Sequence, residues 1–435
     1  MIINFLSSSM KYKGNQMKMK KLSFILLIIG LFVSCGETSH PVVKNYPKTV
    51  VLEERTTDTD LIKPTINTPT IDSTFNTRIK MIDKSDTAIS NYPKIQTWNS
   101  NMTLMRVGNR LYDAKTLKES HYTKNSTKPY ETLCSRNSDY FRWSHKSSDR
   151  FFVLDSSKRL VQGKIEKNSI SCSNVLESFS DYEKIHIGPF EGNIDKNDKY
   201  LLLSAKKEND TTIYLILYDI ANHKRVWTKV LPDDHWVYDS SDQSWLPAVM
   251  DWISVSPSGK YIVINNRSKA NYTEGLSRYD INFENHAFLK YNYKGSLYSE
   301  GGHGDMGYDQ NHHEVIVEFL TGLGVYSFNL DNPTEIGHEL LDSPYGGGHV
   351  SCRNTEREGW CYITANVDSN GDGLKRIFAL KLDGTGDENV ENFSQTYIDD
   401  NFGATFGGAS PDGTKVIFNS RWETDNIDTF VVEAL

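Results

Sequence analysis

Short apolar strands alternate with polar turns along most of the chain. The clearest units are WISVSPSGKYIVINN (252–266) and GGASPDGTKVIFNSR (407–421), each a strand, a Gly-containing turn and a second apolar strand. Weaker copies of this unit occupy 97–113, 142–155, 193–205, 307–319 and 350–365. Seven copies spaced roughly 45 to 55 residues apart indicate a repeat architecture, and no long segment has a helical period. The pattern predicts an all-β chain folded as a seven-bladed β-propeller.

The first residues follow a different pattern. A basic run, KMKK (18–21), precedes an apolar stretch at 22–33, which is too short to span a bilayer and is typical of an export signal. The stretch ends in LFVSC (31–35), which resembles the bacterial lipobox, whose cysteine is lipidated. We expect residues 1–35 to be a signal peptide with lipidation at Cys35. The alternative is an ordinary signal peptide with a chance cysteine.

The next segment has the composition of a spacer. Residues 36–90 are rich in Thr, Asp, Lys, Pro and Asn, with little apolar periodicity, which predicts a disordered tether. The propeller is then expected over 91–435. One short stretch, Arg78–Ile82, has the alternation of a strand. We hypothesise that it pairs with the last strand, Asp428–Val432, and so closes the ring.

Charge and location narrow the classes of partner. The net charge of −8 argues against a nucleic-acid binder, which needs clustered Lys and Arg. A lipid anchor at Cys35 places the chain in the bacterial cell envelope, at the periplasmic or cell-surface face of the outer membrane.

An exported chain meets an oxidising compartment, where cysteines can pair. Cys352 and Cys361 flank a predicted tight hairpin, CRNTEREGWC, which favours a cross-strand disulfide. Cys134 and Cys172 are then the second candidate pair. Free buried thiols are the alternative.

Aligning the copies predicts where a site lies, because the first strand of each propeller blade lines the central channel. One register of these strands holds Glu191, Trp252, Asp305, His349 and Phe406. Side chains two apart share a strand face, so His303 joins Asp305, and Arg353 joins His349. Glycines precede both histidines, in EGGHGDMGYD and YGGGHVSCRN, and permit close approach of a ligand. We expect this set to meet at one mouth of the channel, although strand capping by the histidines is the alternative.

Three chemistries suit such a set. His303, Asp305 and His349 are acceptable ligands for a divalent metal such as Mn, Zn or Ca. Alternatively His303, His349 or Tyr308 acts as a general base while Arg353 neutralises a carboxylate, as proton abstraction next to a uronate carboxyl requires. The third possibility is binding without catalysis, with Glu191, Trp252 and Phe406 contacting a glycan.

The SPSGK and SPDGT turns resemble those of WD40-like repeats in TolB-type propellers. The glycine-preceded histidines His303 and His349, on adjacent blades, resemble those of the propeller polysaccharide lyases. That family includes oligogalacturonate lyases, which use a histidine-bound manganese, and ulvan lyases, in which histidine, tyrosine and arginine carry out β-elimination. The resemblance implies a lyase of acidic, uronate-containing and possibly ulvan-type polysaccharides. The alternative is a non-catalytic envelope lipoprotein that binds glycan or protein.

Overall fold

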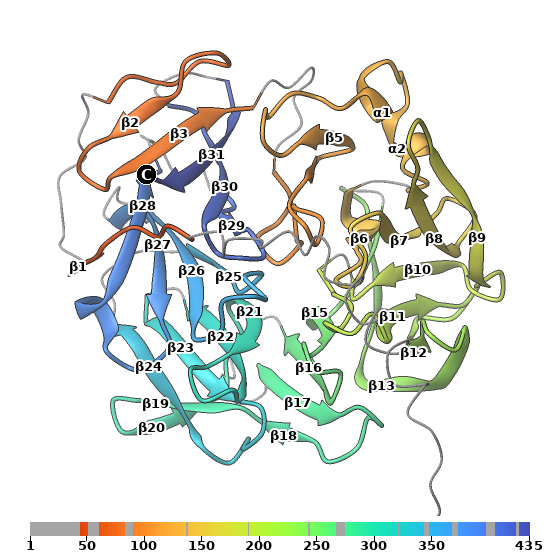
Figure 1. Ribbon diagram of the computed structural model, residues 1–435. Helices are drawn as coiled ribbons and strands as arrows, with labels where there is room; N and C mark the ends of the chain where they lie inside the picture. Colours follow the sequence, from red (N-terminus) through yellow and green to blue (C-terminus); the bar gives the residue numbers. More distant parts are fainter. Residues whose placement is uncertain are drawn as a thin grey trace, which may run out of the picture. The chain divides into compact units, whose positions relative to one another are not determined.

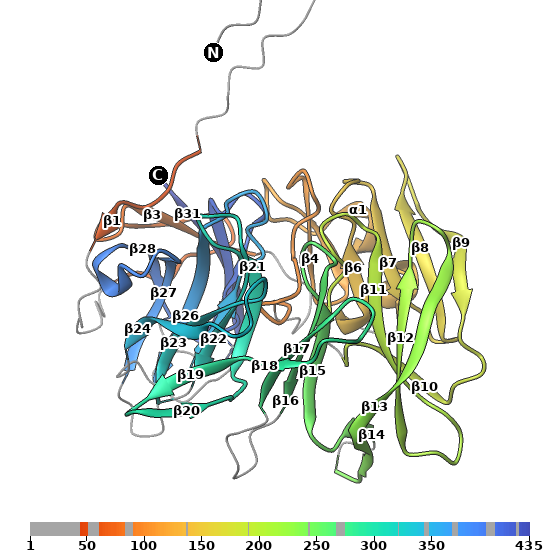
Figure 2. The same ribbon diagram turned by 90° about the horizontal axis from the view of Figure 1, so that it is seen from below.

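Among the described residues, seven sheets follow one another around a ring in the part of the chain that folds as one unit, Asn45–Leu435 (Figures 1 and 2). Their neighbouring strands pair antiparallel, with one parallel pair as the exception. The computed structural model describes residues 44–50, 61–82, 90–135, 138–189, 191–241, 244–266, 275–320, 322–342, 348–367, 373–396, 405–422 and 426–435. The predicted signal peptide and Cys35 lie outside these residues. No helix among them is long and apolar enough to cross a membrane.

Six of the sheets have four strands or more and form the blades. The first comprises β6 (Phe141–Trp143), β7 (Arg150–Leu154), β8 (Arg159–Ile165) and β9 (Ile170–Ser178). The second comprises β10 (Lys184–Ile187), β11 (Tyr200–Lys206), β12 (Thr212–Asp219), β13 (Lys224–Asp239) and β14 (Ser244–Pro247). The third comprises β15 (Met250–Val255), β16 (Tyr261–Asn266), β17 (Leu276–Asp280) and β18 (Ala287–Phe288).

Two of the remaining three blades, the fifth and the sixth, include strands from the N-terminal part of the chain. The fourth comprises β19 (Lys290–Tyr293), β20 (Ser296–Tyr298), β21 (His303–Tyr308), β22 (Glu314–Leu320), β23 (Gly324–Asn329) and β24 (Ile336–Asp342). The fifth comprises β25 (Gly348–Ser351), β26 (Trp360–Val367), β27 (Gly373–Lys381), β28 (Val390–Gln395) and, at its edge, β1 (Thr49–Val50). The sixth comprises β29 (Gly408–Ala409), β30 (Lys415–Ser420), β31 (Asp428–Ala434), β3 (Thr77–Met81) and β2 (Thr70–Asp72).

The seventh sheet is small. It contains only β4 (Leu104–Val107) and β5 (Arg110–Asp113), extended by single bridges from Trp98 to Met105 and from Tyr112 to Glu119. It stands between the sixth and first blades (Figure 1). The all-β propeller fold is thus present, with six complete blades; the predicted count of seven is reached only by including this sheet. The helical segments are single turns, α1 (His121–Lys124), α2 (Pro129–Thr132), η2 (Ser138–Tyr140) and η3 (Gly386–Glu388).

The N-terminal segment closes the ring. β3 pairs antiparallel with β31, with Ile79 opposite Val432, so the first and last parts of the chain share one blade. This agrees with the hypothesis for Arg78–Ile82. The ordered body therefore begins before residue 91, and the described part of the predicted tether contributes strands rather than disorder.

The repeated turns explain why the blades share a register. Asp195, Ser256 and Ser410 occupy the same place in three blades, and each side chain accepts a hydrogen bond from a backbone N–H five residues on. Gly259 and Gly413 follow with φ of +75° and +72°, which favour glycine. Apolar side chains from neighbouring sheets fill the space between the blades. The inner strands are therefore held rigidly around the centre.

Candidate functional site

Residues Ser90–Thr97 run through the centre of the ring and bond to its inner strands. The Pro93 carbonyl accepts from Ser351 Oγ (2.8 Å), and the Lys94 carbonyl accepts from Asn193 Nδ2 (2.9 Å). Further bonds join Ser90 N to Asn419 Oδ1, Asn91 Nδ2 to Arg106 O, Gln96 Nε2 to Arg353 O and Trp143 Nε1 to Thr97 O. This central segment, which the sequence did not reveal, brings Tyr92 and Lys94 to the predicted mouth.

His303 and His349 meet at that mouth. Their rings stack with centroids 4.5 Å apart and planes 4° apart. His303 is exposed and its Nδ1 lies 3.0 Å from the Gly348 carbonyl oxygen, whereas His349 is buried. Tyr92 and Phe406 contact the His349 ring, with centroids 5.3 and 5.1 Å away. The prediction that His303, His349 and Phe406 gather at one place therefore agrees with the structure.

Burial shifts the pKa values of His349 and of the nearby Glu318. Burial, the neighbouring His303 and the Lys94 cation lower the pKa of His349 well below its ordinary value. Burial also raises the pKa of the Glu318 carboxyl to about 8, against the opposing effect of Lys94. Glu318 Oε2 accepts from Gly302 N at 3.0 Å, and its carboxyl fits only because Gly304 has no side chain. Near neutral pH both His349 and most of Glu318 are therefore uncharged.

Lys94 contacts Glu191 and Trp252 on the other side of the mouth. Its side chain is 2% exposed, and its Nζ lies 2.6 Å from Glu191 Oε2 and 4.0 Å from the centre of the Trp252 ring. Trp252 is itself 1% exposed. The predicted stacking of a sugar on Trp252 is therefore wrong for this arrangement, because the indole is buried and carries Lys94 on its face.

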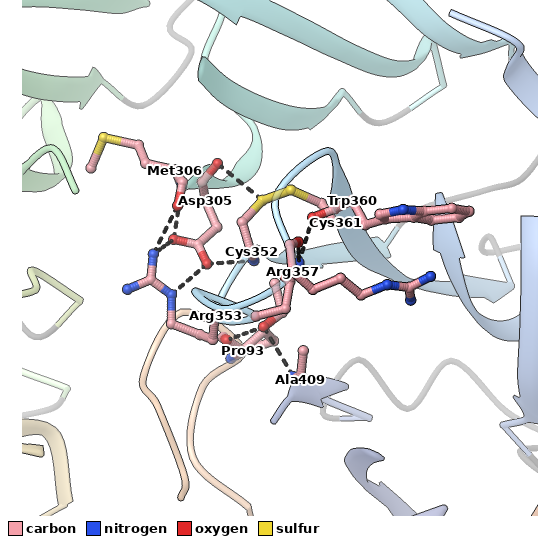
Figure 3. Close-up of a disulfide and its surroundings, with 11 residues drawn as sticks. Pro93, Asp305, Met306, Cys352, Arg353, Arg357, Trp360, Cys361 and Ala409 are labelled. Atoms are coloured by element: carbon pink, nitrogen blue, oxygen red, sulfur yellow. Dashed lines mark hydrogen bonds and ion pairs between the residues drawn. A yellow bond between two sulfur atoms is a disulfide. The ribbon is translucent and has the colours of Figure 1, made fainter. Parts of the chain in front are cut away.

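Asp305 and Arg353 form a buried ion pair instead of a ligand set (Figure 3). Arg353 Nε and Nη2 donate to the two Asp305 oxygens at 2.8 and 2.7 Å, and Cys352 N donates to Asp305 Oδ2 at 2.7 Å. Arg353 Nη2 also donates to the Met306 carbonyl. These bonds saturate the carboxylate, and the predicted roles of Asp305 in metal binding and Arg353 in substrate binding find no support in this geometry.

Two disulfides are present, one of them beside this ion pair. Cys352 bonds to Cys361 with their Cα atoms 4.5 Å apart, between β25 and β26. Cys134 bonds to Cys172. Both pairs are those named from the sequence.

Tyr308 lies at the other end of the channel. It closes β21, five residues after His303, which at about 3.4 Å per residue is about 17 Å away. Its ring lies 4.1 Å from Lys196 Nζ and stacks on His312. A cleft at that end is lined by Tyr308, His145, Lys196 and Arg353 among others. The structure therefore separates Tyr308 and Arg353 from the two histidines, contrary to the predicted single mouth.

The two histidines do not fit a shared metal ion. The lone pairs of an imidazole lie in its plane, so parallel stacked rings cannot both aim at one ion about 2.1 Å away. Within the described ranges, no three His, Cys, Asp or Glu side chains come together as ligands. The predicted set His303, Asp305 and His349 is therefore not assembled.

The fold is similar to that of solved proteins, although the sequence is not. No protein-family model and no curated protein matches the sequence. An oligogalacturonate lyase from Vibrio parahaemolyticus has a TM-score of 0.57 at 10% identity, over 89% of this chain and 98% of that one. An oligogalacturonate lyase in complex with manganese has a TM-score of 0.56 at 9% identity, over 84% of this chain and 96% of that one. This chain shares their propeller fold. At such identity the likeness concerns the fold alone.

Sequence reasoning missed three residues of the mouth. Tyr92 and Lys94 lie in a segment without strand periodicity, and Glu318 sits in the middle of an apolar strand, EVIVEFL. A carboxylate in such a strand was a usable signal, because buried Glu is rare unless it is paired or functional.

Proposed function

We propose that this protein is a polysaccharide lyase that cleaves an acidic, uronate-containing polysaccharide by β-elimination at the His303–His349 mouth. The carrying observation is the contact between His303 Nδ1 and the Gly348 carbonyl oxygen. A carbonyl can only accept, so Nδ1 holds the proton and the lone pair of a neutral His303 is on Nε2. The shared fold with two oligogalacturonate lyases supports the same reaction class.

The proposed step moves one proton. His303 Nε2 takes the proton from C5, next to the uronate carboxyl group, and the electrons of that C–H bond form the C4=C5 double bond as the C4–O bond breaks. The leaving oxygen takes a proton from the imidazolium formed at His303. Burial and the nearby Glu191, Asp251 and Glu318 raise the pKa of the Tyr92 phenol, so Tyr92 is a poor acid and is not the proton donor in this step.

His349 supports this base without titrating itself. Because His349 stays neutral, it adds no positive charge that would resist protonation of the stacked His303. The neighbouring aromatic rings of Tyr92 and Phe406 hold His349 in place. The proposed base, His303, is thus exposed to substrate, while the buried His349 ring stacked on it fixes its orientation.

The test is an absorbance assay on the full chain. Polygalacturonate, ulvan, alginate and glycosaminoglycans are supplied separately, and the ultraviolet absorbance of the unsaturated uronate is followed. The proposal expects a rise with at least one of them and none with His303→Gln. Flat traces with all four, together with measurable binding, would instead establish a glycan-binding protein.

We also propose export and lipid anchoring in the cell envelope, with Cys35 as the anchor. The two disulfides support an oxidising compartment. In a bacterial host, Cys35→Ala should move the protein from the membrane fraction to the soluble fraction. Unchanged membrane association would reject the anchor.

A further inference from the structure

Lys94 is a buried cation at the centre of the mouth, and its counterion, Glu191, is more exposed than Lys94 itself. The Lys94 side chain is 2% exposed, whereas Glu191 is 23% exposed. Nζ and Oε2 lie 2.6 Å apart, but neither atom has a hydrogen bond of good geometry. The contact is therefore a charge contact rather than a directed bond. Such a contact is easier to exchange for another carboxylate.

The backbone around Glu191 is fixed at its ends. Gly188 and Gly192 pack against the Ile253 carbonyl, where a Cβ at Gly188 would lie 1.9 Å from that oxygen. Ile253 N donates to Gly188 O, and Asn193 N donates to Ser254 Oγ. Within the described residues, the Glu191 side chain forms an ion pair with Lys94 alone. The side chain can therefore leave Lys94 without breaking these backbone bonds.

The groups around Lys94 favour a carboxylate partner. His349 is neutral and Glu318 is mostly protonated near neutral pH, so neither satisfies the Lys94 charge fully. The Trp252 face covers one side of Nζ at 4.0 Å and the Tyr92 ring lies 5.4 Å away. A cation so desolvated interacts strongly with an incoming anion.

We infer that Lys94 is the residue that receives the substrate's carboxylate, and that Glu191 occupies this position in the free protein as an internal competitor. The inference rests on the proposed function and deepens it, since it names a uronate carboxylate as the group recognised. Substrate binding exchanges one carboxylate for another on Lys94, and the displaced Glu191 side chain turns to solvent. The interaction would position C5 of the sugar beside His303.

A second pair in the same molecule provides a matched control. Lys206 is 3% exposed, pairs with Glu183 at 2.5 Å and lies 4.2 Å from the Trp245 ring. Unlike Lys94, Lys206 Nζ donates directed bonds to Glu183 Oε2 and to the Lys207 carbonyl. This pair lines a different cleft, which contains none of the mouth residues, so Glu183→Gln removes a similar charge at an unrelated place.

The experiment measures binding of trigalacturonate and of its methyl-esterified form to the full chain by calorimetry. Glu191→Gln should tighten trigalacturonate binding about tenfold. In the wild-type protein the Glu191–Lys94 ion pair must break before the substrate carboxylate binds, which lowers the apparent affinity. Lys94→Met should weaken it at least about thirtyfold, and Lys94→Arg should restore part of the loss. Neither Glu183→Gln nor the esterified ligand should show these changes.

The outcomes separate this inference from the lyase proposal. Binding that responds as expected without any turnover would reject the lyase and keep the carboxylate site. Turnover with unchanged trigalacturonate affinity in Glu191→Gln and in a folded Lys94→Arg or Lys94→Met would reject the site and keep the lyase. Circular dichroism of each variant identifies any that does not fold. Weaker binding by Glu191→Gln would also overturn the inference, since Glu191 would then help rather than compete.

Discussion

His303 and His349 lie ring on ring, 4.5 Å apart, although 46 positions separate them in the chain. They stand at the starts of β21 and β25, the inner strands of two neighbouring blades. The outer ring is exposed and the inner one is buried. Burial, the neighbouring His303 and the Lys94 cation lower the pKa of His349, so the inner ring stays neutral.

Replacing the outer ring should remove catalysis and leave the fold. In His303→Gln the amide can still donate to the Gly348 carbonyl but cannot take a proton, so turnover of a cleaved polysaccharide should fall by about 10² to 10⁴. Initial rates of absorbance change measure this. His312→Gln, at an exposed histidine on the far end of the channel, is the control and should keep wild-type rates. Loss in His303→Gln of less than about fivefold would remove His303 from the role of base.

The raised pKa of Glu318 makes stability fall with rising pH. Folded Glu318 keeps its proton up to about pH 8, whereas an ordinary Glu releases it near 4.5. Between these values the unfolded state binds fewer protons, so this group's contribution is full below 4.5 and is lost as pH rises through 8. Glu318→Gln, which resembles the protonated side chain, should flatten the decline in Tm between pH 5 and 9. The exposed Glu284→Gln should leave the decline as it is, and an equal slope in Glu318→Gln and wild type would refute the assignment.

The sequence predicted the propeller, and that His303 and His349 lie at one mouth of its channel, because both predictions rest on local periodicity. Turn residues such as Ser256 and Ser410 recur in one register, and each precedes a buried strand. Alternation also assigned His303, His349 and Arg353 to channel-facing strand surfaces. Alternation could not assign the position of these residues along the channel axis, because one face of a strand extends from one end of the channel to the other. Four residues separate His349 from Arg353, a rise of about 13 Å.

The central segment could not be predicted at all. Pro93 and its neighbours show neither a strand nor a helix pattern, and a proline is unfavourable inside a sheet. The position of the segment depends on bonds such as Ser351 Oγ to Pro93 O, between residues 258 apart. Long-range contacts of this kind leave no signal in the local sequence. The position of Lys94, and therefore the positive charge at the mouth, could not be predicted from the sequence.

Arg353 should prove essential for stability rather than for chemistry. Arg353→Ala leaves the buried Asp305 carboxylate without its partner, which costs about 3 to 5 kcal/mol of unfolding free energy. Urea denaturation measures the loss, and the double variant Asp305→Leu/Arg353→Met should recover part of it because no charge is left buried. A catalytic Arg353 would give the opposite result, namely normal stability with lost turnover.

Closure of the ring by β3 predicts that one residue before the repeats stabilises the whole fold. Ile79 is fully buried between β31 and the fifth blade, where it packs with Phe393, Phe430 and Val432. Ile79→Ala removes buried methyl groups and leaves a cavity, and should lower the free energy of unfolding by about 2 to 5 kcal/mol. Ile71, on the neighbouring β2, is 45% exposed, so Ile71→Ala changes the same residue type outside the core and should cost less than about 0.5 kcal/mol. Equal denaturation midpoints for the two variants would mean that β3 is an accessory strand, and that β31 holds the last blade without it.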